Sequence, residues 1–164
     1  MRFPWSARRP AVDVAEGERV LAWARTAGGD VVAGTREALY LPGGVRVRWE
    51  RVESADWDVE AEVLSVSEVG SWGEQRPVHE VAVAEPRLLL DLVRERVTAS
   101  VVLQRHVPVR GRRGLRVIAR RAPSRHGPLS WVFEFDEGVD PDDPVVRAAA
   151  DVALLEARTE VGDR

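Results

Sequence analysis

The sequence has no cysteine among its 164 residues. Disulfide bonds, thiolate nucleophiles, iron–sulfur clusters and cysteine-ligated zinc are therefore excluded. Lysine is also absent, so all 24 basic residues are arginine. This leaves two interpretations open: a need for forked guanidinium contacts, or codon bias in a GC-rich bacterial genome. The joint abundance of alanine, valine, glycine and arginine favours codon bias.

Long apolar segments are missing as well. The amino terminus, MRFPWSARRP, carries arginines but lacks the apolar core of about 7–15 residues that a signal peptide needs. No apolar run approaches the ~18 residues of a membrane span. We therefore expect a cytoplasmic protein without a transmembrane segment.

Motifs for catalysis and cofactor binding are not found. No serine lies in GxSxG or SxxK, and no phosphate-binding glycine loop occurs. His79, His106 and His126 show no metal-ligand spacing, and the acidic stretch 136–143 does not follow the calcium-loop pattern. The acids Asp56 and Asp58 alternate along a strand, which is more typical of a solvated face than of a catalytic pair. We expect no enzyme, no cofactor and no metal.

Charge is strongly segregated along the chain, although the formal net charge is only −3. Residues 50–85 carry 2 arginines against 10 acids, residues 96–133 carry 9 arginines and no acid, and residues 134–164 carry 3 arginines against 10 acids. The acid-free block could hold an anionic partner such as nucleic acid. Alternatively, its arginines pair with acids on adjacent strands, and this second interpretation is the one we favour.

The candidate contacts for an anion are four arginines. Arg110, Arg112 and Arg113 lie in the turn sequence RGRRG, and Arg125 lies in the following loop. Guanidinium groups at a flexible tip can reach phosphates. A solvated hairpin turn is the alternative, and it is the one we prefer, because no aromatic residue adjoins the tip for stacking on bases.

The first hundred residues predict seven short strands and then a helix. Alternating apolar and polar residues indicate strands at 19–24, 31–33, 37–41, 45–49, 52–59, 62–66 and 78–83. The period then changes to that of a helix over 86–98. We expect its apolar face to consist of Leu88, Leu89, Leu92, Val93 and Val97.

The remaining residues predict a three-stranded meander at 101–109, 115–121 and 130–136, with a closing helix. Asp143 is a good N-cap and Pro144 suits the first helical position. We expect Val145, Ala149, Val152 and Leu155 to form the inner face of this helix. On the last strand, Trp131, Phe133 and Phe135 are expected to face a core shared by both parts of the chain, while Glu134 and Asp136 pair with Arg116 or Arg120.

The strand carrying Trp23, the segment VVAGTREALYLP and the segment VRVRWERVESADWD together resemble the bacterial pleckstrin-homology-like (PH-like) domains. The resemblance covers residues 16–99. It implies an α+β fold with a curved antiparallel sheet or barrel of about seven strands, capped by the helix at 86–98. It also implies an interaction or assembly module. The basic cluster of phosphoinositide-binding relatives is reduced here to Arg19 and Arg25.

We therefore divide the chain into an N-terminal arm (1–15), a PH-like domain (16–99) and an extension (100–164) packed on it. The expected function is that of a non-enzymatic interaction or scaffold module with a protein partner. The alternative is an anion or nucleic-acid binder that uses segment 105–125. Trp5 and Trp72 fall in expected loops, where a tryptophan either anchors a partner or packs against the sheet.

Overall fold

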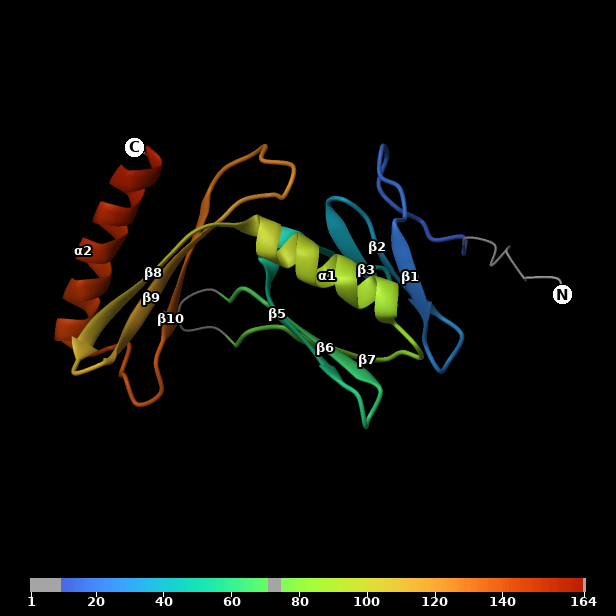
Figure 1. Ribbon diagram of the computed structural model, residues 1–164, viewed down its shortest axis with the longest axis horizontal. Helices are drawn as coiled ribbons and strands as arrows, with labels where there is room; N and C mark the ends of the chain where they lie inside the picture. The colour runs from blue at the N-terminus through green and yellow to red at the C-terminus, as the bar shows by residue number, and fades with distance from the viewer. Residues whose placement is uncertain (1–9, 71–74, 164) are drawn as a thin grey trace, which may run out of the picture.

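The computed structural model describes residues 10–70 and 75–163. Within them the chain forms ten strands in three antiparallel sheets, two α-helices and one short 3-10 helix. The molecule is elongated: the strands of the first half lie towards one end and the C-terminal helix lies at the other (Figure 1). The predicted α+β class is confirmed.

The first sheet has the strand order β1-β2-β3-β4. Its strands are β1 (Ala22–Arg25), β2 (Val31–Gly34), β3 (Ala38–Leu41) and β4 (Val45–Arg48). Tight turns join neighbouring strands. Gly43 and Gly44 both have positive φ in the β3–β4 turn, a conformation that glycine adopts without steric cost.

The second sheet, with the order β5-β6-β7, faces the first. After the 3-10 helix η1 (Trp49–Arg51) come β5 (Val52–Asp58), β6 (Val63–Glu68) and β7 (Val78–Ala82). An isolated bridge between Thr26 and Val83 joins the end of β1 to the end of β7. The seven predicted strands are therefore all present, but they form two sheets of four and three strands.

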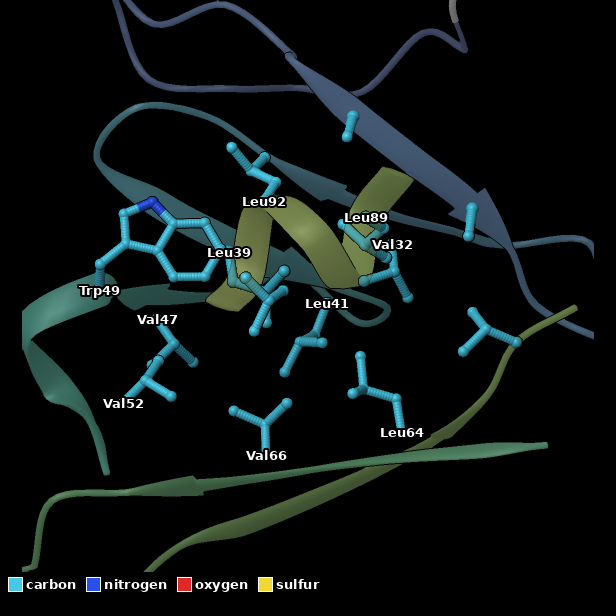
Figure 2. Close-up of a cluster of buried hydrophobic side chains, with 14 residues drawn as sticks. Val32, Leu39, Leu41, Val47, Trp49, Val52, Leu64, Val66, Leu89 and Leu92 are labelled. Atoms are coloured by element: carbon cyan, nitrogen blue, oxygen red, sulfur yellow. The ribbon is translucent and has the colours of Figure 1, made fainter. Parts of the chain in front are cut away.

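Helix α1 (Arg87–Ser100) closes the space between these sheets, so the predicted helix is confirmed. Leu89 and Leu92 point into a core that contains Trp49, Leu39 and Leu64 (Figure 2). A Cβ on Gly34 would lie 2.6 Å from the Leu92 side chain, so glycine lets α1 approach β2 closely.

One residue of the expected inner face of α1 is wrong. Leu88 is 75% exposed, whereas its neighbour Leu89 is fully buried. Consecutive helical residues point about 100° apart, and the buried face is centred between Leu89, Leu92 and Val93, which leaves Leu88 outside it.

The second half begins directly after α1. Strands β8 (Val101–Arg110), β9 (Arg113–Arg120) and β10 (Ser130–Phe135) form a sheet in the order β10-β9-β8. Helix α2 (Pro144–Val161) packs on β8 and β9. Asp143 caps α2 by accepting a hydrogen bond from the backbone N–H of Val145 at 2.8 Å, as predicted.

Three of the four residues expected on the inner face of α2 are wrong, whereas Ala149 does pack against the second core. The buried residues are Val146, Ala150, Ala153 and Ala157. Val145, Val152 and Leu155 instead point to solvent. The aromatic side chains of β10 already fill the space beneath the helix, so α2 presents small residues to the sheet.

The two halves have separate cores. Trp131, Phe133 and Phe135 pack with α2 in the second core, so the core shared by both halves that was expected for them is not found. A small third cluster joins the halves instead, in which Ile118 and Val132 of the second half contact Val69 of the first.

The described part of the N-terminal arm is packed on the outer face of the first sheet. Val12 and Val14 contact a small apolar cluster there. Glu18 binds the Tyr40 hydroxyl and the Arg46 guanidinium. Burial works to raise the pKa of Glu18, but these hydrogen bonds outweigh it, and the pKa lies below its usual value. Trp5 and Trp72, which were expected in loops, lie outside the described residues.

Among residues 10–70 and 75–163, neither helix combines the length and the apolar character needed to cross a bilayer.

Candidate interaction surfaces

The predicted anion-binding tip lies where β8 turns into β9, and two of its three arginines already have partners. The Arg110 guanidinium binds the carboxylate of Asp143, the cap of α2. The Arg113 guanidinium donates to the backbone carbonyl of Glu137 at 3.2 Å. Within the described residues Arg112 makes no ion pair or side-chain hydrogen bond, so one guanidinium of the tip is available.

The fourth candidate, Arg125, lies far from this tip. It occupies the loop between β9 and β10, at the opposite end of the sheet (Figure 1). Since β9 has eight residues and a strand rises about 3.4 Å per residue, the two places are about 25 Å apart. The structure therefore does not bring the four arginines into one site.

Two further arginines of the acid-free block are paired with acids within the second half. Arg105 of β8 contacts Glu156 and Glu160 of α2. Arg116 of β9 contacts Glu134 of β10 at 3.2 Å, and the strand register places these two residues opposite each other. The favoured interpretation, internal pairing with acids on adjacent elements, is confirmed for these arginines, and so is the expected Arg116–Glu134 pair.

Arg120 is buried between the halves. Its guanidinium donates to the Ser100 hydroxyl at 3.1 Å and to the Glu53 carbonyl at 3.4 Å. Burial lowers the pKa of Arg120, and the charges of Glu134 and Glu53 oppose that effect. Burial likewise raises the pKa of Glu53, although Arg76 lies 2.5 Å from its carboxylate. Arg120 of the second half therefore links this half to the first through Ser100 and Glu53.

Two of the three histidines have an acidic partner, whereas His126 is exposed in the β9–β10 loop. His79 lies 2.8 Å from Glu68, and His106 lies 2.8 Å from Asp136. Asp136 accepts a further hydrogen bond from the backbone N–H of Gly114, and these two hydrogen bonds lower its pKa. No group of three potential metal ligands occurs among the residues that the structure describes.

The outer face of the β5–β7 sheet has a different character. The strand register aligns Asp56, Ser65 and Glu80 in one row across the sheet. Neighbouring strands lie about 4.8 Å apart, so the two carboxylates flank the serine at a separation of about 10 Å. Both acids are exposed.

The middle strand of this face bears small side chains. Val63, Ser65 and Ser67 of β6 lie in the middle of this face, and the longer Asp56 and Glu80 flank Ser65. Val78, at the start of β7, is 57% exposed, and Val59, in the turn after β5, is 75% exposed. We name the outer-face residues of this sheet the acidic face. Its members are Ser54, Asp56, Asp58, Val63, Ser65, Ser67, Val78, Glu80 and Ala82.

The carboxylates of the acidic face are not neutralised by arginine. In the described part of the chain neither Asp56 nor Glu80 has an ion pair. Asp58 accepts the backbone N–H groups of Glu60 and Ala61, both at 2.9 Å, which shapes the β5–β6 turn. The acidic face therefore presents uncompensated negative charge. In the arginine block, Arg112 and Arg125 have no ion pair within the described residues, but they lie at opposite ends of their sheet.

A hollow of about 420 Å³ lies beside the acidic face, between the β1–β2 turn, the β3–β4 turn and β7. Its apolar lining includes Leu41 and Val81, and its polar lining includes Asp30 and Glu80. The hydroxyl oxygen of Thr26, which also lines this hollow, is buried without a hydrogen-bond partner. No arginine lines it.

Sequence reasoning found the alternation of Asp56 and Asp58 but did not pair this strand with Glu80. The available signal was the excess of acids in residues 50–85. That excess could not indicate which acids would lack a basic neighbour, because this depends on strand register.

Comparisons with protein-family models, with curated proteins and with solved structures found no match to this chain.

Proposed function

We propose that this chain is a non-enzymatic, PH-like interaction module whose acidic face binds a basic segment of another protein. The observation that carries the proposal is the contrast in charge compensation. Three arginines of the 96–133 block are paired with acids of the second half, namely Arg105, Arg110 and Arg116. Asp56 and Glu80, by contrast, have no ion pair among the described residues. The two sheets of four and three strands and the helix between them support the PH-like part of the proposal. We also propose that the protein is located in a bacterial cytoplasm.

The form of the acidic face supports a peptide partner. A row of small residues on β6 runs between carboxylates on the neighbouring strands. An extended or helical basic segment can lie along this row, with its cationic groups reaching Asp56 and Glu80. Val78 offers apolar contact at one end. Charge complementarity of this kind governs association rate and specificity more than affinity.

Anion or nucleic-acid binding through segment 105–125 is the weaker alternative. Arg110 and Arg113 are engaged, and Arg112 and Arg125 lie at opposite ends of the sheet. Nucleic-acid affinity depends on several cations that neutralise neighbouring phosphates together.

The test is titration of the full chain with a fluorescent arginine-rich peptide at low and high salt. The double variant Asp56→Asn, Glu80→Gln should bind the peptide about tenfold more weakly, because two surface ion pairs with the peptide are lost. The control is Glu95→Gln with Glu137→Gln, which removes the same charge from other surfaces. Equal losses in both variants, or no binding by the wild type, would contradict the proposal.

A parallel arm measures retention on heparin. Strong, salt-sensitive retention that falls in the Arg112→Gln, Arg125→Gln variant would favour the alternative instead.

A further inference from the structure

Helix α2 is apolar on two opposite sides. Its inner side packs on the β8–β10 sheet through Val146, Ala150, Ala153 and Ala157. On the outer side, Val145 and Val152 are each 58% exposed, and Leu155 is 68% exposed. A surface helix of a monomer normally carries polar residues opposite its buried face, so the outer side of α2 needs another explanation.

The outer residues of α2 have the spacing of a helix-pairing seam. The apolar Val145, Ala148, Val152 and Leu155, followed by Thr159, recur at alternating intervals of three and four residues. This is the a/d pattern by which helices pack on one another. The fixed position of α2 keeps the seam outward, because Arg105 of β8 holds Glu156 and Glu160 at the side of the helix.

We propose that the seam of α2 binds the seam of α2 in a second copy of this chain, in antiparallel orientation. The central layers then place Val152 against the partner's Leu155, with the reciprocal layer beside it. The next layers on either side place Ala148 against the partner's Thr159. The small alanine lets the two helices approach closely.

Charge beside the seam selects the second copy and the orientation. In the antiparallel pair, Asp151 of each copy meets the partner's Arg158, so two ion pairs form. Asp151 has no ion pair within the described residues, and Arg158 has only a 3.7 Å contact with Asp163. In a parallel pair, Asp151 would instead face the partner's Glu156, and the two carboxylates would repel each other.

The seam is short, so the dimer is expected to be weak. Three large apolar side chains per copy bury much less than the roughly 1,200 Å² of a typical stable complex. We expect a dissociation constant on the order of 10–100 µM.

The experiment is sedimentation velocity of the full chain from low to high micromolar concentration. The wild type should shift from monomer to dimer, and Leu155→Glu should remain monomeric throughout. The matched control is Leu88→Glu, which puts the same charge on an exposed leucine of α1; it should dimerise as the wild type does. Circular dichroism checks that both variants are folded.

A charge swap tests the orientation. Asp151→Arg should weaken the dimer about tenfold, and the double variant Asp151→Arg, Arg158→Asp should restore it. A wild type that stays monomeric at the highest concentration would overturn the proposal. This holds even if that monomer binds lipid vesicles through α2. Equal loss of the dimer in Leu88→Glu and Leu155→Glu would also overturn it, and so would a tighter dimer for Asp151→Arg.

Discussion

The two halves of the molecule use charge and side-chain volume in opposite ways. The first half buries large side chains, among them Trp49, Leu39 and Leu89. On its acidic face, Asp56 and Glu80 form no ion pair with any residue that the structure describes. The second half covers aromatic strand residues with an alanine-rich helix face. There, Arg105 and Arg116 each meet an acid on the adjacent element.

This difference shows that an uneven charge distribution along a sequence does not by itself locate a charged surface. In the most basic block of the chain, Arg105, Arg110 and Arg116 are neutralised by acids of β10 and of helix α2 with its cap, which follow the block in the sequence. In the acidic block Glu53 is paired with Arg76 and Glu50 with Arg48. Asp56 and Glu80 have no ion pair among the described residues, so their charge remains on the surface.

The largest expected effect concerns the first core. Leu89→Ala should destabilise the fold by about 2–5 kcal/mol, because it removes a fully buried side chain and leaves a cavity. Urea denaturation followed by tryptophan fluorescence measures the change. The adjacent variant Leu88→Ala should alter stability by less than about 0.5 kcal/mol. Similar losses for the two leucines would contradict the orientation of α1.

The next prediction concerns the link between the halves. Arg120→Ala should cost about 2 kcal/mol, because it removes charged hydrogen bonds to Ser100 and Glu53 at a buried position. Arg116→Ala, which breaks a partly exposed pair with Glu134, should cost about 0.2–1 kcal/mol. If thermal unfolding shows Arg116→Ala to be the more damaging change, the assignment of Arg120 as the link is wrong.

The smallest effect concerns the cap of α2. Hydrogen bonds from Arg110 and from the backbone N–H of Val145 hold the pKa of Asp143 below its ordinary value of 3.8. A carboxyl group with a lowered pKa stabilises the fold above its unfolded pKa, and this contribution disappears as pH falls through the lower folded value. The melting temperature of Asp143→Ala should therefore lie below that of the wild type at neutral pH. The gap should narrow below about pH 4, and a gap of constant size would argue against this role.

Much of the fold follows from local patterns in the sequence. Strict alternation in VRVRW predicted β4, and the cap Asp143 with Pro144 predicted the start of α2. These features depend on neighbours along the chain, which a sequence displays directly.

The inner faces of the helices were harder to predict. For α2, the largest apolar residues suggested one face, but the sheet beneath it is already filled by Trp131, Phe133 and Phe135. Alanines therefore face the sheet, and the larger residues lie outside. The choice depends on the volume supplied by another element, which the helix sequence alone does not contain.

The candidate site shows the same limit. The arginines of RGRRG were recognisable as a group, yet Arg110 is bound by an acid 33 positions away. Which charges remain free is set by contacts across the sheet.

Helix α1 passes into β8 without a connecting residue: Ser100 ends one element and Val101 begins the next. The chain is tied again at this place, since the backbone N–H of Arg121 donates to the Ser100 carbonyl at 2.8 Å. This second connection restricts bending between α1 and β8, so we expect the two halves to rotate together in solution. A protein that binds β5–β7 and turns this sheet would therefore also move α2, at the other end of the molecule.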